Sequence, residues 1–219
     1  MARIGLLGGS FNPAHRGHRH ISLQAMAALG LEEIWWLVSP GNPLKEAAKD
    51  MAPFAARLAS AVRMARGARI RVSDFERRNG TRFTIDTVRL LKGRYPNDRF
   101  IWLLGSDTLP NFHEWRDWRG LAREVPIAVI RRPGYDSTAH AARAMGWLRG
   151  FVRPSSQAMQ WTEWSAPAIL FLRLPPDPTS ATAIRAADPH WHRRTSSRVE
   201  RWGHGQPWFA RRPLDRTSR

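Results

Sequence analysis

The sequence predicts an α/β protein in which helices cover both faces of a doubly wound parallel sheet within a single domain. Short apolar runs alternate about five to six times with segments of helical periodicity. Several of these runs are apolar throughout, as strands buried on both faces are. Polar loops containing glycine or proline follow the ends of the runs, where open parallel sheets bind ligands.

Length and composition agree with one globular domain. The chain has 219 residues, 42% of them hydrophobic, and no cysteine. The lack of cysteine excludes disulfides and thiolate chemistry and fits a cytoplasmic location. The start of the chain lacks the apolar core and cleavage site of a signal peptide, and no apolar run approaches the ~20 residues of a membrane span.

The net charge of +17 is large. Such a surface attracts nucleotides, nucleic acids and anionic membranes alike. Only three of the 35 basic residues are lysine, and an arginine- and alanine-rich composition is typical of a GC-rich genome. The charge by itself therefore does not indicate a nucleic-acid-binding protein.

The first strand begins near Ile4 and ends at the pair Gly8-Gly9, and residues 21–29 have the spacing of an amphipathic helix. The polar segment from Ser10 to His18 therefore lies between a strand end and a helix start. The two glycines let backbone N–H groups approach a phosphate closely, and the helix N-terminus adds partial positive charge.

Two histidines in this segment, His15 and His18, are three residues apart and share one side of the first helical turn. Two imidazoles beside a phosphate-binding turn can donate hydrogen bonds to phosphate oxygens. One alternative is an ordinary surface pair. Another is a metal site with His20 as third ligand, although no cysteine or acidic residue in this stretch completes it.

The stretch from Gly8 to His18 resembles the signature of the HIGH-type nucleotidyltransferases, and within them it is most similar to the bacterial nicotinate-nucleotide adenylyltransferase family. That family often has Asp in place of Asn12 and Thr in place of Ser10. The resemblance implies a Rossmann-like fold. It also implies catalytic roles for His15 and His18 and ATP binding by Gly8, Gly9, Ser10 and Phe11.

The second strand, Ile34–Val38, ends in a loop that two prolines and a glycine restrict. In the resembled family this loop directs a basic residue toward the triphosphate, which implies a catalytic role for Lys45 and a mononucleotide contact for Asn42. The alternative for Lys45 is an exposed loop lysine. Residues Pro53–Ala65 then have helical spacing.

The third strand, Ile70–Ser73, precedes a polar segment with the turn signal Asn79-Gly80. Thr84 is suited to cap a helix over Ile85–Leu91. The segment that begins at Phe83 is similar to the family's Tyr-Thr-x-Asp-Thr-Leu segment. This similarity implies that Thr84 and Asp86 lie by the pyridine mononucleotide. The alternative for Thr84 is a cap alone.

A fully apolar fourth strand, Phe100–Leu104, ends at Gly105-Ser106-Asp107. The family's Gly-x-Asp at this point implies that Gly105 and Asp107 bind ATP, with the carboxylate near ribose hydroxyls. Trp115 matches the family's tryptophan at the nicotinate site, where a planar ring packs on an aromatic face. Trp118 is expected to pack in the core.

The remaining elements are a strand over Pro126–Ile130, a helix over residues 139–148 and a last strand, Ala168–Leu172. An Arg-Pro-Gly turn follows the first of these, and it implies mononucleotide binding by Arg132. The expected domain covers residues 1–204, and the arginine-rich residues 205–219 are expected to form a flexible tail.

A second motif covers Thr179–Arg185 and resembles the superfamily's Ser-Ser-Thr-x-Ile-Arg, with Ala181 in place of the middle serine. Ser180 or Thr179 can cap a helix whose N–H groups face a phosphate. The resemblance implies ATP binding by Ser180 and Thr182 and a catalytic role for Arg185 at the pyrophosphate. The alternative is a helix start without such a role.

Together the motifs predict an enzyme that transfers an adenylyl group from ATP to nicotinate mononucleotide, with Mg²⁺ bound through the ATP phosphates and no metal held by the protein. A sibling enzyme acting on phosphopantetheine or nicotinamide mononucleotide is the first alternative. A basic nucleic-acid-binding protein is the second, but it leaves both motifs unexplained. The sequence leaves the oligomeric state open.

Overall fold

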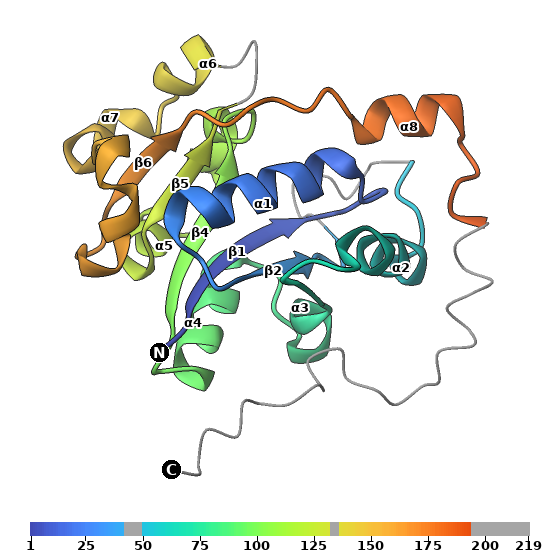
Figure 1. The fold of residues 1–219 in the computed structure, drawn as a ribbon, viewed down its shortest axis with the longest axis horizontal. Helices are drawn as coiled ribbons and strands as arrows, with labels where there is room; N and C mark the ends of the chain where they lie inside the picture. The colour runs from blue at the N-terminus through green and yellow to red at the C-terminus, as the bar shows by residue number, and fades with distance from the viewer. Residues whose placement is uncertain (42–49, 132–135, 194–219) are drawn as a thin grey trace.

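The structure is a computed structural model that describes residues 1–41, 50–131 and 136–193 (Figure 1). Three predicted site residues, Asn42, Lys45 and Arg132, lie outside these ranges. The predicted tail, residues 205–219, lies outside them as well, and so does the end of the predicted domain.

The six strands form one parallel sheet with the order β3-β2-β1-β4-β5-β6. This arrangement confirms the predicted doubly wound parallel sheet. The strands are β1 (Arg3–Gly9), β2 (Glu33–Val38), β3 (Ile70–Ser73), β4 (Arg99–Gly105), β5 (Ile127–Ile130) and β6 (Ile169–Leu172).

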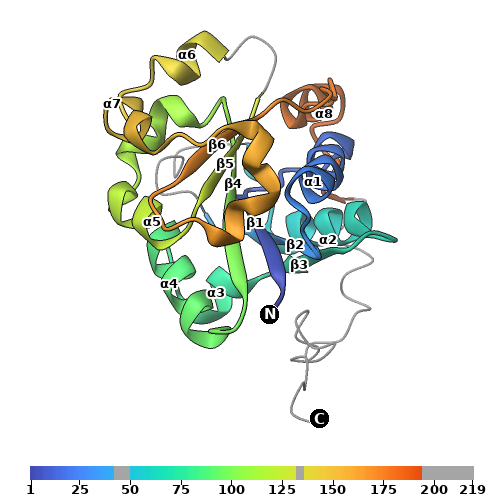
Figure 2. The same cartoon turned by 60° about the vertical axis from the view of Figure 1, so that its left-hand side comes forward.

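Helices cover both faces of this sheet (Figure 2). The α-helices are α1 (Arg16–Leu29), α2 (Phe54–Ala65), α3 (Phe75–Asn79), α4 (Thr84–Arg94), α5 (Trp118–Glu124), α6 (Asp136–His140), α7 (Met145–Leu148) and α8 (Ala181–Ala187). The 3₁₀ segments are η2 (Leu109–Glu114), η3 (Arg149–Phe151) and η4 (Ser155–Glu163). None of the helices in the described ranges is long and apolar enough to cross a membrane.

Strand side chains alternate between two hydrophobic clusters, one on each face. In β2, Trp35 packs into the cluster beneath α4 and α5, whereas Trp36 packs into the cluster beneath α1 and α2. Neighbouring bulky residues are therefore both buried, which explains why the strand sequence is apolar at every position.

The connections leave a switch point beside β1. The chain passes from β1 outward to β2 and β3, then returns to place β4 on the other side of β1. Ligands bind outside the carboxyl ends of strands at such a point. The segment after β1 and the Gly105–Asp107 turn after β4 both lie there.

The predicted helix over residues 139–148 is wrong, because the chain forms two short helices, α6 and α7, instead. Ala139 and Ala144 are both buried. Five residues apart, they would point in well-separated directions from one straight helix. A break between them allows both side chains to reach the core.

Two local predictions around α3 and α4 also differ. Asn79-Gly80 does turn the chain, but as the end of α3, where Gly80 adopts φ 64°. Thr84 is the first residue of α4 rather than its cap. The cap position is taken by Phe83, whose carbonyl accepts a hydrogen bond from Thr87 Oγ1 at 3.3 Å.

The carboxyl group of Glu76 in α3 is buried with Thr87 Oγ1 as a donor at 3.3 Å. Burial raises the pKa of Glu76 from its ordinary 4.5 to about 7, and the Thr87 hydrogen bond opposes this shift. Between these two values the folded protein binds a proton that the unfolded chain has released. Glu76 therefore lowers the free energy of unfolding as the pH rises through this interval.

Glu76→Gln should remove this dependence, because the amide keeps the shape and an acceptor but does not ionise. At about pH 8 the variant should be more stable than the parent by about 3 kcal/mol, since the pKa shift from 4.5 to about 7 corresponds to ~1.4 kcal/mol per unit. Near pH 5 the two should agree. Urea unfolding at both pH values measures this, with the exposed Glu163→Gln as the matched control. An unchanged pH dependence in Glu76→Gln would contradict the assignment.

Candidate active site

The two sequence motifs, some 160 residues apart in the chain, lie together at the carboxyl edge of the sheet (Figure 1). Arg185 of α8 donates from Nη1 to the carbonyl oxygen of Asn12 at 2.7 Å and from Nε to Asp50 Oδ2 at 2.7 Å. Ser180 caps α8 by accepting a hydrogen bond from the N–H of Ala183 at 3.4 Å. The structure thus brings the predicted arginine against the loop that follows β1.

A second contact joins the segment before α8 to the start of α1. Arg16 Nε donates to Asp177 Oδ2 at 3.0 Å, and the N–H of Thr179 donates to Asp177 Oδ1 at 2.9 Å. Hydrogen bonds from Thr179, together with the charge of Arg16, lower the pKa of Asp177 to about 2. Asp177 is therefore ionised at neutral pH and ties Thr179 to α1.

The histidine pair is held side by side at the start of α1. The ring centroids of His15 and His18 are 3.9 Å apart. His15 occupies the cap position with extended backbone, and its N–H donates to His18 Nδ1 at 3.3 Å. His15 is buried, whereas His18 is half-buried. The two rings are therefore in contact with each other, and neither is an isolated surface side chain.

Gly17 is required by the packing around this pair. A Cβ atom at Gly17 would lie 3.0 Å from Cε1 and Nδ1 of His15 and 3.1 Å from the carbonyl oxygen of Thr179. These separations are shorter than ordinary van der Waals contact. Glycine therefore allows the second motif to approach the histidine ring of the first.

Other residues contact both the ring of His18 and its backbone carbonyl. The Phe11 ring lies 4.9 Å from that of His18 and stacks on Trp36 at 5.0 Å. Trp36 Nε1 donates to Ser22 Oγ at 2.8 Å, and this hydroxyl donates to the His18 carbonyl at 2.8 Å. Phe11 adopts φ 48°, a left-handed conformation that is unfavourable for a non-glycine residue. Its buried stacking offsets that cost.

Asn12 has a role that explains its departure from the family's usual Asp. Its Nδ2 donates to the carbonyl of Asp50 at 2.9 Å, and its Oδ1 accepts from the N–H of Ala52 at 3.2 Å. An ionised carboxylate has no proton to donate to the first of these partners. The amide therefore suits the pairing found in this chain.

The predicted ATP-binding residues Gly8, Gly9, Ser10 and Phe11 lie at the end of β1 beside the switch point. A Cβ at Gly8 would meet the Trp102 ring of β4 at 2.8 Å. Packing of the neighbouring strand thus requires this glycine independently of any phosphate. Phe11 is buried, so its side chain supports the loop and only its backbone can face a ligand.

Sequence reasoning missed two polar residues of α2 that hold this loop from beneath. Arg57 is 1% exposed and donates to the carbonyl oxygens of Ser10, Ser39, Pro40 and Ala52 at 2.7–3.0 Å. Ser60 Oγ accepts from the N–H of Ala14 at 3.0 Å. Burial lowers the pKa of Arg57. The sequence does contain a signal for Arg57. It lies between Phe54 and Ala61 on the apolar face of α2, where a charged residue is unusual.

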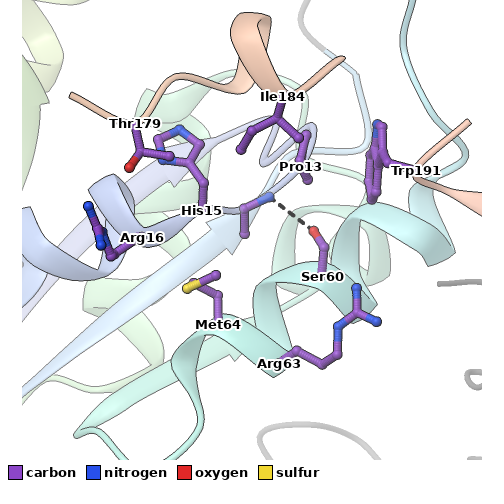
Figure 3. A pocket seen from close by; sticks show the side chains of 10 residues that line it. Pro13, His15, Arg16, Ser60, Arg63, Met64, Thr179, Ile184 and Trp191 are labelled. Carbon is purple, nitrogen blue, oxygen red and sulfur yellow. Dashed lines mark hydrogen bonds between the residues drawn. The ribbon is translucent and has the colours of Figure 1, made fainter. Parts of the chain in front are cut away.

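A cavity of about 360 Å³ adjoins His15 on the side of α2 and α8 (Figure 3). Among the predicted site residues, His15 alone lines it. The lining residues are Pro13, Ala14, His15, Arg16, Ser60, Arg63, Met64, Thr179, Ile184 and Trp191. The cavity therefore lies beside the β1 loop rather than at the glycine pair.

Three of the residues predicted to bind the mononucleotide, those within the described ranges, lie after β3 or β4. Thr84 begins α4, and half-buried Trp115 lies with its ring centroid 6.3 Å from that of Trp102 and 5.3 Å from that of Phe112. The Arg116 guanidinium lies over the Phe83 ring at 4.6 Å. This contact brings the Thr84 and Trp115 segments together.

The other predicted residues lie on β4, α4, α5 and α8 or in the turn after β4. Gly105 ends β4, and Asp107 and Asp86 are half-buried. Trp118 packs against Phe112 and Trp147 with centroid distances of 5.8 and 5.5 Å, as predicted for a core residue. Thr182 is exposed on α8.

The site is rich in hydrogen-bond donors and cationic groups. Backbone N–H groups, two imidazoles and Arg185 surround the end of β1, which suits binding of a phosphorylated ligand. Within residues 1–41, 50–131 and 136–193, no cluster of three or more His, Cys, Asp or Glu side chains could hold a metal ion.

Comparison with known proteins gives the family. A family model described as cytidylyltransferase-like matches residues 6–187. The probable nicotinate-nucleotide adenylyltransferase of Erythrobacter litoralis is 56% identical over 195 residues, which cover 89% of each chain. The corresponding protein of Gluconobacter oxydans is 52% identical over 183 residues, covering 84% of this chain and 93% of the relative.

Solved structures give the same fold at low identity. Plasmodium falciparum nicotinic acid mononucleotide adenylyltransferase complexed with NaAD superposes with a TM-score of 0.61 at 18% identity, over 85% of this chain and 83% of that chain. The same enzyme complexed with APC gives 0.60 at 17% identity, over 92% and 96% of the two chains.

Gly17→Ala should impair the site more than the fold. The added methyl group must displace the His15 ring or the Thr179 carbonyl, so the two motifs should separate. We expect the apparent affinity for ATP to fall about tenfold, which corresponds to ~1.4 kcal/mol. Isothermal titration with a non-hydrolysable ATP analogue measures this.

Gly93→Ala is the matched control. A Cβ at Gly93 in α4 would meet no atom within 4 Å. Alanine there should stabilise the helix by about 0.5–1 kcal/mol and leave nucleotide binding unchanged. Equal nucleotide affinity in the Gly17→Ala variant and the parent would show that the close approach at Gly17 has no part in the site.

Proposed function

The chain belongs to the nicotinate-nucleotide adenylyltransferase family of cytidylyltransferase-like proteins, and on this basis we propose that it transfers the adenylyl group of ATP to nicotinate mononucleotide. The products are deamido-NAD and pyrophosphate, and the reaction belongs to NAD biosynthesis. The observation that carries the proposal is the meeting of the two motifs at the switch point, where Arg185 contacts Asn12. We also propose a cytoplasmic location, where other steps of NAD biosynthesis would share its substrates.

The chemistry needs orientation and charge stabilisation rather than a protein nucleophile. The mononucleotide phosphate is already ionised and attacks the α-phosphate of ATP in line, and the bond to pyrophosphate breaks. His15 and His18 donate hydrogen bonds to the reacting phosphate oxygens. Arg185 and Lys45 stabilise the charge that develops on pyrophosphate.

The surroundings of Arg185 support its role toward an anion. Its Nε–H already donates to a carboxylate, that of Asp50, whose side chain is 58% exposed. Arginine has five N–H groups, and the bonds to Asp50 and Asn12 use two of them, so others remain that can donate to a phosphate. A pyrophosphate oxygen can accept a hydrogen bond from these remaining guanidinium N–H groups.

The two substrates are proposed to use different parts of the switch point. ATP binds at the end of β1, at Gly105 and Asp107, and at the start of α8 through Ser180 and Thr182. The pyridine mononucleotide binds where Arg116 joins the α4 and η2 segments. Its proposed contacts are Asn42, Thr84, Asp86, Trp115 and Arg132.

Mg²⁺ bound through the ATP phosphates remains part of the proposal. This ion favours phosphate and water oxygens over cages built from protein side chains alone. The described residues at the end of β1 supply backbone donors for such phosphates. The ion would withdraw charge from the phosphoryl oxygens.

An acceptor panel tests the proposed reaction. Purified protein with ATP and Mg²⁺ should release pyrophosphate with nicotinate mononucleotide and much more slowly with nicotinamide mononucleotide. Phosphopantetheine should give no release, because the Thr84 and Trp115 segments form the acceptor side. Coupled detection of pyrophosphate measures all three. Turnover of phosphopantetheine alone would replace this proposal by the sibling activity.

His18→Ala tests the catalytic role of the histidine pair. Loss of one donor used in the transition state typically lowers turnover about 10²–10³-fold, or ~3–4 kcal/mol. The apparent affinity for ATP should change much less, because backbone N–H groups remain. Since His18 packs on Phe11, we also expect a stability loss of about 1–2 kcal/mol.

Steady-state kinetics and thermal unfolding on one preparation separate these effects. His20→Ala is the control: His20 is also half-buried on α1, but its Nε2 lies 2.7 Å from the carbonyl of Pro175. It should lose similar stability and keep turnover within about threefold. Turnover near that of the parent in His18→Ala would remove His18 from the mechanism.

A further inference from the structure

Arg57 is an unusual buried cation. Its guanidinium is 1% exposed, and its partners are four backbone carbonyls rather than a carboxylate. Within the described part of the chain, no acidic side chain forms an ion pair with it. Burying an uncompensated charge is costly, and burial lowers the pKa of Arg57 accordingly. Such a cost is consistent with a role beyond stability.

The four carbonyls come from three separate segments. Nη1 donates to Ser10 and Ser39 at 2.7 Å each, Nη2 donates to Pro40 at 3.0 Å, and Nε donates to Ala52 at 3.0 Å. Ser10 follows β1, Ser39 and Pro40 follow β2, and Ala52 precedes α2. One side chain thus joins the exits of two neighbouring strands.

These bonds also fix the direction of the N–H groups that follow. In a trans peptide unit the C=O of one residue and the N–H of the next point in opposite directions. The Ser10–Phe11 and Pro40–Gly41 units are trans, and both carbonyls point at the guanidinium. The N–H groups of Phe11 and Gly41 therefore point away from Arg57, toward the side of the loops opposite α2.

We propose that Arg57 is a positioning residue for the triphosphate of ATP, an inference that rests on the proposed function. It turns two peptide units so that the Phe11 and Gly41 N–H groups face the phosphates. Its own charge, which no acidic group of the described residues neutralises, adds positive potential behind them. Arg57 does not touch the substrate and acts through these loops.

The test compares Arg57→Lys and Arg57→Met with the parent at a temperature well below the melting temperature of each. Lysine keeps the charge but cannot reach four carbonyls at once, since it presents a single ammonium group. Affinity for α,β-methylene-ATP should fall about tenfold in Arg57→Lys and about 100-fold in Arg57→Met. Affinity for nicotinate mononucleotide should stay within about threefold, because four of its five proposed contacts, all except Asn42, follow strands that Arg57 does not join.

Arg66→Lys and Arg66→Met are the matched controls. Arg66 is the C-cap residue of α2 and has an exposed side chain, so these variants make the same substitutions outside the loop contacts. They should bind the analogue as the parent does. If Arg57→Met does not fold, Arg57→Lys alone decides the question.

A purely structural Arg57 predicts another pattern, in which both Arg57 variants melt at lower temperature but their folded forms bind the analogue like the parent. That result would overturn the proposal, as would equal losses of affinity for both substrates. The analogue titration does not depend on the acceptor. A parent protein that binds the analogue but fails to use nicotinate mononucleotide would contradict the proposed function and leave the role of Arg57 testable.

Discussion

The position of β1 in the sheet is the constraint on which the rest of the site depends. Because β1 lies between β2 and β4, its carboxyl end is flanked by the exits of both neighbours. The glycine-containing turn, the histidine pair and the Gly105–Asp107 turn meet there for a topological reason. The segment before α8 then passes over the start of α1 and adds the second motif.

Within that frame, polar contacts rather than core packing set the geometry of the β1 loop. Arg57 and Ser60 hold it from α2, Arg185 holds it from α8, and Asn12 joins it to residues 50–52. Arg57, Ser60 and Arg185 bind backbone groups of the loop, whereas Asn12 and Phe11 contribute their own side chains. In the proposed function, the two histidines and the backbone N–H groups of this loop bind the phosphates.

The apolar runs were sufficient to predict the strands, because a strand buried on both faces has a distinctive composition. The alternation of Trp35 and Trp36 between two cores follows from strand geometry alone. Short helices were predicted less well. The break between α6 and α7 results from the burial of Ala139 and Ala144, and α3 is only five residues long, so neither carries a usable periodic signal.

The sequence by itself determined the fold class and the two motifs, because glycine turns, histidine spacing and the Ser-Ala-Thr-Ala-Ile-Arg segment are local patterns. Only the tertiary structure decided which groups hold these motifs in place. Arg57 and Asp177 join residues far apart in the sequence, and the Trp36–Ser22–His18 chain of hydrogen bonds joins β2 to α1. Gly17 shows the same division: its presence is visible in the sequence, but the reason for it is the Thr179 carbonyl, which reaches it only after folding.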